Sequence, residues 1–327
     1  MSDPPERMSH DEFDWIAALR PLTRGAPAAL GLMDDAAVLP ARPGFDLVIS
    51  EDAMVEGVHF LAGERADIVA RRLLRTSLSD LAAKAAEPFG YTMTAAWPST
   101  RGWDDRMAFI RGLDEDGRRY GVVLVGGDTV ATPGPLTLSA TVFGWVPAGA
   151  MVRRAGALPG HALVVCGVIG DGHLGLKAAL GEALEGGEAL AASYRLPEPR
   201  FELREALRAH AAAAADVSDG LIADALHIAE ASGCGLVLDL ARMPLSPAAQ
   251  TWVRAQNGPT RALLQLASGG DDYALVCSAA DGEALVRAAE GQGVRATVVG
   301  SFVTGSGVEV RLGDEVLAPH RLGWRHT

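Results

Sequence analysis

Several short clusters of acidic side chains in this sequence could bind metal ions and phosphates. They fall at the expected ends of strands or just before helices, where functional sites are often built. The clusters are Asp34 with Asp35, Ser50 with Glu51 and Asp52, Asp128, and Asp216 with Asp219 on either side of Ser218. Each cluster taken alone could be a turn or a helix N-cap, because Asp and Ser favour both positions. Four such clusters in one chain favour a shared site.

Asp80 is the most informative single residue. On a helix predicted over residues 66–83, it continues the stripe of Val69, Leu73 and Thr76 at spacings of four, three and four. Its carboxylate is therefore expected to face inward. The alternative is an ordinary helix ion pair with Lys84, four residues further on.

A cluster of carboxylates requires cations. Two unit charges about 5 Å apart repel each other by roughly 3 kcal/mol at an effective dielectric near 20, so converging carboxylates would not all stay ionised alone. The available donors are hard oxygens without a His-His or Cys-His set, which favours Mg²⁺ over zinc or copper. The only lysines are Lys84 and Lys177, and no P-loop pattern occurs. An acidic pocket without a P-loop lysine indicates phosphoryl transfer organised by metal ions.

Composition limits the class of protein. The 327 residues are 49% hydrophobic, which is sufficient for two compact domains. A net charge of -12 argues against nucleic acid as a partner. No apolar run approaches the roughly 18–20 residues of a membrane span, and the N-terminus has no apolar segment typical of a secretory signal, so a cytoplasmic location is expected. Three distant cysteines without Cys-x-x-Cys spacing indicate neither a disulfide framework nor a thiolate zinc site.

The expected elements form an α+β protein of two domains. In the first half we expect an opening helix with a capping box of Ser9 and Glu12, strands over 46–50, 91–97, 122–125 and 136–146, and helices over 66–83 and through Met107 and Ile110. In the second half we expect strands over 162–166, 236–240, 273–277 and 297–302, and helices from His173 and over 201–210, 221–232 and 283–292. The Pro-, Gly- and Arg-rich segment 147–160 separates the halves. The predicted domains are residues 1–147 and 148–327.

Two glycine-rich segments could approach an anion. Gly126 and Gly127, expected in the turn before Asp128, would let the backbone pass close to a phosphate, although such a turn is also an ordinary loop signal. The run Gly167–Gly172 lies between a strand and a helix but lacks the glycine order of a dinucleotide fold. It is interpreted as a tight connection whose helix N-terminus could still receive an anion.

Six motifs, in order, resemble the thiamine-monophosphate kinase family. They are MDDAAVL from Met33, ISEDAMVEGVHF from Ile49, TSLSDLAAKAA from Thr76, VGGDT from Val125, DVSDGL from Asp216 and SGGDDYAL from Ser268. The resemblance implies an N-terminal α+β domain with a mixed or antiparallel sheet that pairs across a homodimer, and a C-terminal α/β domain, as in the wider group of aminoimidazole ribonucleotide synthetase. It also implies direct transfer of the γ-phosphoryl group of ATP to the phosphate of thiamine monophosphate, with several Mg²⁺ ions.

The resemblance assigns roles to individual residues. The implied metal ligands are Asp35, Ser50, Glu51 through its backbone carbonyl, Asp52, Asp80, Asp128, Asp216 and Asp219. The implied ATP contacts are Tyr120, Gly127, Asp128, Arg154 and Ser218, and the implied acceptor contacts are His59, Asp271 and Trp324. Ordinary alternatives are a core histidine for His59, helix-end packing for Tyr120, a junction ion pair for Arg154 and tail packing for Trp324.

The chain departs from the family pattern at three positions. Met33 stands where Gly is usual, Glu51 where Thr is frequent, and Asp271 where Glu is usual. Two alternative functions follow from these departures and from the breadth of the group. One is an ATP-using member with a different acceptor, such as an amidine precursor or selenide. The other is a nucleotide- and metal-binding homologue with impaired catalysis.

Overall fold

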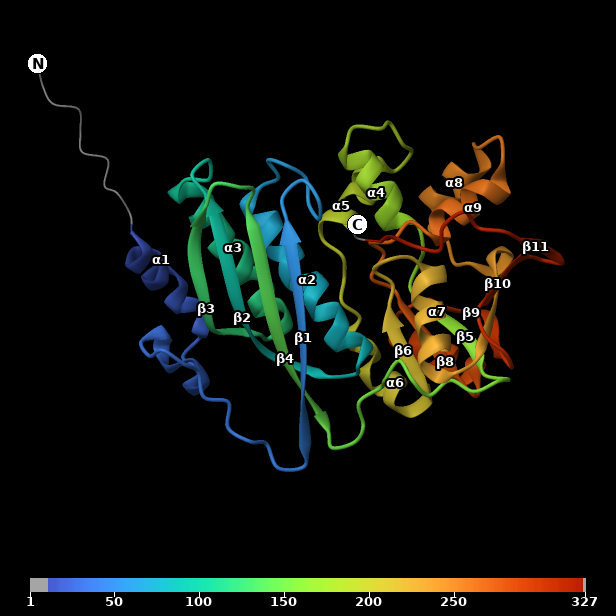
Figure 1. The fold of residues 1–327 in the computed structure, drawn as a ribbon, viewed down its shortest axis with the longest axis horizontal. Coiled ribbons are helices and arrows are strands. Elements are labelled where there is room, and N and C mark those ends of the chain that lie inside the picture. The colour runs from blue at the N-terminus through green and yellow to red at the C-terminus, as the bar shows by residue number, and fades with distance from the viewer. Residues whose placement is uncertain (1–10, 326–327) are drawn as a thin grey trace, which may run out of the picture. The chain divides into compact units, whose positions relative to one another are not determined.

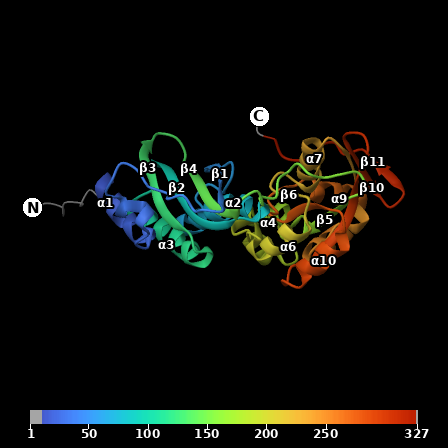
Figure 2. The same cartoon turned by 90° about the horizontal axis from the view of Figure 1, so that it is seen from below.

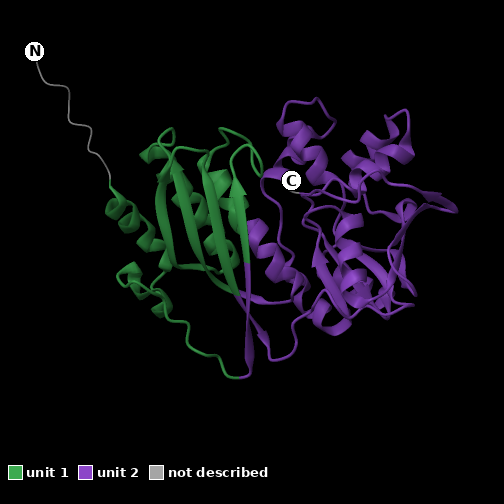
Figure 3. Cartoon of the chain, in the orientation of Figure 1, with its two compact units in different colours: residues 1–43, 51–74, 89–143 green, residues 44–50, 75–88, 144–327 purple. Residues whose placement is uncertain are grey.

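The computed structural model describes residues 11–325, which form two compact units. The first unit comprises the residues up to 43 with 51–74 and 89–143, and the second comprises 44–50, 75–88 and the residues from 144 onward. Both units combine helices with a sheet (Figures 1 and 3). The predicted α+β, two-domain class is thereby confirmed.

A four-stranded sheet occupies the N-terminal half, in the order β1-β4-β2-β3. Its strands are β1 (Phe45–Val55), β2 (Glu87–Pro98), β3 (Val123–Thr132) and β4 (Thr137–Pro147). Strands β2 and β3 run parallel, with a register shift between Tyr91 and Thr92. At the two ends of β1 and β4, backbone hydrogen bonds join Gly44 to Ala148 and Glu56 to Leu136, so these strands run antiparallel. The sheet is mixed, as predicted.

Helix α3 (Trp103–Tyr120) packs on β2 through its apolar face. Phe109 lies edge-to-face with Trp97, at 5.4 Å between ring centroids, and Leu113 is fully buried. Acidic residues begin the helix and arginines end it, which suits the helix dipole. Gly121 then ends it in the left-handed conformation. Figure 2 shows α3 along one face of β2 and β3.

The first helix begins later than the sequence indicated. Helix α1 (Glu12–Leu19) is capped by Asp11, whose side chain accepts from the Asp14 amide while the Asp14 side chain accepts from the Asp11 amide. The predicted capping box of Ser9 with Glu12 is therefore wrong, although Ser9 itself lies outside the described residues. Glu12 is the first residue of the helix, so the reciprocal pair lies two residues further along the chain.

A seven-stranded sheet forms the centre of the C-terminal half, in the order β11-β10-β7-β9-β5-β8-β6. The strands are β5 (Ala162–Cys166), β6 (Ala213–Asp216), β7 (Gly235–Asp239), β8 (Leu275–Ala279), β9 (Ala296–Val303), β10 (Val308–Leu312) and β11 (Glu315–Leu317). Only β7 and β10 pair in parallel, and the other neighbouring pairs are antiparallel.

Helices cover both faces of this sheet. They are α4 (Asp171–Ala179), α5 (Gly187–Arg195), α6 (Arg204–His210), α7 (Leu221–Ser232), α8 (Pro247–Arg254), α9 (Pro259–Ala267) and α10 (Gly282–Glu290). The central strand β5 divides its side chains between two cores. Leu163 and Val165 join the core that contains α7, while Val164 and Cys166 join the core that contains α6 and α10. Because successive side chains point to opposite faces, a strand buried on both sides is apolar throughout.

Two strands continue several residues past their predicted C-terminal ends. Strand β1 continues to Val55, so Ser50, Glu51 and Asp52 lie within it rather than at its end. Strand β3 continues to Thr132, so the Gly126–Asp128 segment is extended and is not a turn. Pairing with neighbouring strands overrides the weak strand preference of these residues. No helix within residues 11–325 has the length and apolar character needed to cross a bilayer.

Candidate functional site

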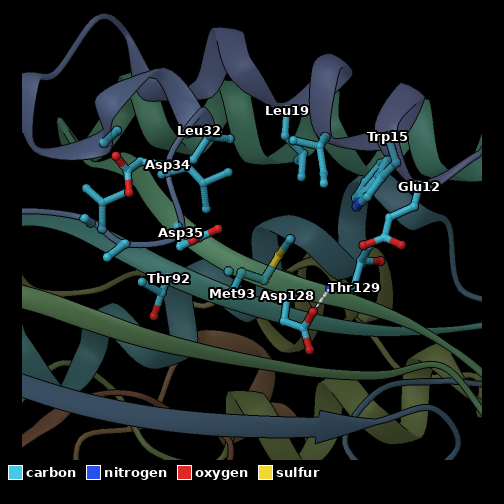
Figure 4. Close-up of a pocket in the computed structure, with 18 residues that line it drawn as sticks. Glu12, Trp15, Leu19, Leu32, Asp34, Asp35, Thr92, Met93, Asp128 and Thr129 are labelled. Atoms are coloured by element: carbon cyan, nitrogen blue, oxygen red, sulfur yellow. Dashed lines mark hydrogen bonds between the residues drawn. The ribbon is translucent and has the colours of Figure 1, made fainter.

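A pocket of about 320 Å³ in the first unit brings together two of the predicted metal ligands. Asp35 comes from the loop that leads to β1, and Asp128 comes from β3. Figure 4 shows their carboxylates reaching the pocket from separate segments, and the Thr129 amide donates to Asp128 Oδ1 at 2.9 Å. Both carboxylates are solvent exposed. The pocket is therefore open to a solvated cation or a phosphate.

The rest of this pocket combines apolar walls with further acidic groups. Trp15, Leu19 and Met93 supply apolar surface, while Glu12 and Asp34 add carboxylates at the edge. Such a pocket suits a ligand that has both an apolar part and a polar part.

Gly127 lines the same pocket, for a reason that packing explains. A Cβ at this position would lie 2.0 Å from the Met93 carbonyl oxygen on the neighbouring strand. Only glycine fits so close a backbone approach. The predicted contact of Gly127 with ATP stays a prediction, because the glycine is required by the sheet in any case.

The side chains of the three predicted ligands on strand β1 point to two opposite faces of the sheet. Ser50 Oγ donates to Asp80 Oδ2 at 2.6 Å, a distance typical of a hydrogen bond to a charged oxygen. Glu51 Oε1 instead accepts from Ser139 Oγ of β4 at 2.9 Å. Because side chains alternate along a strand, Ser50 and Asp52 share one face and Glu51 points to the other. The extra charge of Glu51 is therefore directed away from the face that carries Ser50.

The inward stripe of α2 (Ala66–Ala83) is confirmed for Val69, Leu73 and Thr76, which are buried. Asp80 is half-buried at the end of this stripe and binds Ser50. Lys84, the alternative partner, donates its Nζ to the Ala214 carbonyl oxygen of β6 at 2.7 Å. Lys84 therefore ties the end of α2 to β6 and is not a simple exposed partner of Asp80.

Electrostatics connect Lys84 to three predicted site residues of the second unit. Burial lowers the pKa of Lys84; the nearby Asp216 and Asp80 carboxylates oppose this effect, and the Arg154 guanidinium adds to it. Asp216 ends β6 and is only 6% exposed. Asp80, Arg154 and Asp216 thus act on one ammonium group, so the structure brings these three residues into one neighbourhood.

The loop between β6 and α7 holds Ser218 and Asp219. Asp224 fixes this loop, because its Oδ2 accepts hydrogen bonds from the Asp219 and Gly220 amides at 3.1 Å each. The sequence analysis did not identify Asp224. Asp224 is 2% exposed and lies 3.7 Å from His227 Nδ1. The sequence signal that could have identified it is an Asp in the first turn of a predicted helix. Such a side chain can accept hydrogen bonds from the backbone amides at the helix N-terminus.

The turn of residues 269–272, here called the Gly-Gly-Asp-Asp turn, contacts this loop. The Asp271 amide donates to the Ser218 carbonyl at 2.8 Å, and the Trp324 amide donates to the Asp219 carbonyl at 2.9 Å. Backbone hydrogen bonds therefore join two pairs of predicted site residues, Ser218 with Asp271 and Asp219 with Trp324. The Trp324 side chain is 50% exposed, so it does not simply pack the tail.

The backbone amides at the N-terminus of α4 already bind a side chain of the protein. Asp272 Oδ1 accepts from the Gly170 and Gly172 amides at 2.9 Å each, so a carboxylate of the protein occupies the position. The proposed reception of an anion at this helix end is corrected accordingly. Burial raises the pKa of Asp272 to about 8, and the two amide hydrogen bonds oppose the increase.

His59 and Tyr120 have structural surroundings in the first unit. His59 Nδ1 accepts from the Val55 amide at 3.0 Å, and its carbonyl oxygen accepts from Arg72 Nε at 3.1 Å. Tyr120 ends α3, with the Arg119 guanidinium 5.5 Å from its ring centroid. Their predicted roles toward the acceptor and ATP stay predictions.

The donor atoms of the candidate ligands suit Mg²⁺. All are carboxylate, hydroxyl or carbonyl oxygens, which are the donors that Mg²⁺ prefers. Within residues 11–325, no group of three or more His, Cys, Asp or Glu side chains already has the geometry of a metal site. Magnesium binding is usually completed by substrate phosphates and water, so the protein alone need not form a closed cage.

Comparison with known proteins defines the family. Residues 33–146 match the model of the AIR synthase related protein, N-terminal domain, and residues 159–313 match that of the C-terminal domain. A thiamine-monophosphate kinase of Caulobacter vibrioides is 56% identical over 96% of this chain and 90% of the relative.

Two solved structures with similar folds support the same family. The thiamine-monophosphate kinase of Stenotrophomonas maltophilia K279a aligns with a TM-score of 0.80 and 35% identity, covering 92% of this chain and 96% of that chain. A structure described as AaThiL complexed with AMPPCP and TMP aligns with a TM-score of 0.78 and 25% identity, covering 97% of each chain. The chain belongs to the thiamine-monophosphate kinase family of AIR synthase related proteins.

Proposed function

We propose that this protein transfers the γ-phosphoryl group of ATP to the phosphate of thiamine monophosphate, giving thiamine diphosphate and ADP. The observation that carries the proposal is the 56% identity to a thiamine-monophosphate kinase over 96% of the chain. The AaThiL complex with AMPPCP and TMP supports both substrates, since that relative aligns over 97% of this chain.

The acceptor requires no side-chain base. A phosphate monoester is already an anion at neutral pH, so its oxygen can attack without losing a proton to the protein. The protein's task is to hold the two anionic substrates in line and to neutralise their charge. Magnesium, when bound, supplies that neutralisation and lowers the repulsion between phosphates.

The residues proposed to hold Mg²⁺ are Asp35, Ser50, Asp52, Asp80, Asp128, Asp216 and Asp219, with the backbone carbonyl of Glu51. The short hydrogen bond from Ser50 orients Asp80, which supports its role as a ligand. Glu51 binds Ser139 on the opposite face, so its side chain does not add charge beside Ser50. This geometry argues against the impaired-homologue alternative at that position.

The nucleotide is proposed to contact Tyr120, Gly127, Asp128, Arg154 and Ser218, and thiamine monophosphate to contact His59, Asp271 and Trp324. The backbone hydrogen bonds that join Ser218 to Asp271 and Asp219 to Trp324 support one group of these residues. A homodimer and a cytoplasmic location complete the proposal.

The test is an acceptor panel. The purified protein is incubated with ATP and Mg²⁺ and, in separate reactions, with thiamine monophosphate, thiamine, selenide or an amidine precursor. We expect ADP formation with thiamine monophosphate and equal amounts of thiamine diphosphate. Turnover with another acceptor alone would favour a different member of the group. Nucleotide binding without any turnover would favour a homologue that has lost catalysis.

A further inference from the structure

The Gly-Gly-Asp-Asp turn is held in a conformation that its residues do not favour. Asp271 has φ of 62° and Tyr273 has φ of 50°, both in the left-handed region that non-glycine residues rarely adopt. Such residues persist only where surrounding contacts fix them, and they concentrate at functional sites. The structure must therefore contain groups that fix this turn.

One side of the turn is fixed by the β6–α7 loop. The Asp271 amide donates to the Ser218 carbonyl at 2.8 Å, and the Tyr273 amide donates to the Val217 carbonyl at 2.9 Å. Gly270 fits closely here, because a Cβ would lie 2.6 Å from the Ser218 carbonyl oxygen. These contacts set where the turn lies but involve only backbone groups.

The other side of the turn is fixed by the Asp272 side chain. Its two oxygens both lie 2.9 Å from the Gly170 amide, and Oδ1 also accepts from the Gly172 amide at 2.9 Å. A Cβ on Gly172 would lie 2.1 Å from the Asp271 carbonyl oxygen, so helix α4 and the turn are in direct contact. The carboxylate thus connects the first turn of α4 to the residue beside Asp271.

The two neighbouring aspartates therefore differ in surroundings. Asp272 faces backbone amides at a helix N-terminus, and its side-chain oxygens accept their hydrogen bonds. Asp271 is near Tyr273, whose hydroxyl donates to Asp271 Oδ1 at 3.4 Å, and near His173, whose pKa its charge raises. One aspartate anchors the backbone, and the other presents a carboxylate beside Ser218.

We propose that Asp272 is a positioning residue for the acceptor: by binding the Gly170 and Gly172 amides it holds Asp271 in its left-handed conformation beside Ser218. The inference rests on the proposed function where it assigns Asp271 to thiamine monophosphate. The anchoring itself does not depend on that assignment and can be measured separately.

The main variant is Asp272→Asn, which keeps the size of the side chain. Its carboxamide has one acceptor oxygen and turns an NH₂ group toward amide donors, so at least one hydrogen bond is lost. The matched control is Asp171→Asn, the same substitution at a half-buried aspartate in the first turn of α4. Asp171 Oδ1 accepts from Ser246 Oγ at 2.6 Å and not from the turn.

The first measurement is amide hydrogen exchange, which requires no activity. In Asp272→Asn the amides of Asp271 and Tyr273 should exchange at least about tenfold faster, while those of β8 keep their protection. Asp171→Asn should leave all of these rates unchanged. Unchanged exchange at Asp271 in Asp272→Asn, or equal acceleration in both variants, would overturn the proposal.

The second measurement is steady-state kinetics. In Asp272→Asn we expect the KM for thiamine monophosphate to rise about tenfold while the KM for ATP stays within about twofold, with Asp272→Glu closer to the original protein. Equal changes in both KM values would show a general structural role and contradict the proposal. If the unaltered protein forms no thiamine diphosphate, the proposed function fails, and the exchange experiment still decides the anchoring.

If Asp272→Asn does not fold, Asp272→Glu serves instead. Its longer side chain keeps the carboxyl group but shifts it from the Gly170 and Gly172 amides. Faster exchange at Asp271 and Tyr273 than in the original protein would support the anchoring, and unchanged exchange would overturn it.

Discussion

Adjacent polar residues in this chain make different contacts, because their side chains point in different directions. Ser50 binds Asp80, while Glu51 binds Ser139 on the other face of β1. Asp271 and Asp272 are separated in the same way, one beside Ser218 and the other on the α4 amides. The sequence predicts that such residues matter, but direction depends on pairing with segments far along the chain.

Replacing Asp80 by Asn should lower kcat for thiamine diphosphate formation by roughly 100-fold, because a charged group proposed as a Mg²⁺ ligand is lost at an unchanged size. Asp314→Asn, on an exposed turn, is the matched control and should keep full activity. The rates are measured at saturating Mg²⁺ with equal folded protein. Full activity of Asp80→Asn would remove Asp80 from the proposed ligands.

His173 should titrate far below an ordinary histidine. Burial lowers its pKa to about 4 from 6.5, with Lys177 and Arg321 adding to the effect. The folded state then binds fewer protons than the unfolded state between these values, so this contribution to stability is present above pH 6.5 and is lost as pH falls toward 4.

Imidazole NMR signals provide the measurement. The His173 signal should stay constant from pH 8 to about 5.5. His227 is the internal comparison, because the nearby Asp224 carboxylate raises its pKa above 6.5. A midpoint for His173 near or above that of His227 would contradict the environment described for α4.

At the scale of elements, sustained apolar patterns predicted the structure well. Helices over 66–83 and 221–232 and the strand over 162–166 agree with α2, α7 and β5. The ends of β1 and β3 were predicted too early, since polar residues and glycines resemble turn signals. The short helices α8 and α9 were missed because their residues also suit loops. The Asp272 anchor could not be predicted, because Gly170 lies 102 positions away.

The close approach of β2 and β3 gives a test at this scale. Gly127→Ala should destabilise the protein by about 1–3 kcal/mol, because the new methyl group would meet the Met93 carbonyl oxygen. Gly126→Ala is the neighbouring control, where the nearest atom, Thr92 Cγ2, is 3.6 Å away. Urea unfolding of both variants checks this, and equal stability would show that β3 is not packed as described.

Across the whole molecule, the candidate residues divide between the two units. Asp35, Asp52 and Asp128 belong to the first, and Asp80 and Asp216 to the second. Both substrates of the proposed reaction carry phosphate groups, and the chain itself has a net charge of -12. This balance of charge supports the proposed dependence on magnesium.

The most direct measurement is transfer of labelled phosphate. The protein, in excess over ATP labelled in the γ-phosphoryl group, is mixed with thiamine monophosphate and Mg²⁺, and the products are separated over one turnover. We predict that the label appears in thiamine diphosphate in amounts equal to the ADP formed, and that a chelator of Mg²⁺ abolishes transfer. Label released as inorganic phosphate, or transfer that persists without Mg²⁺, would contradict the account.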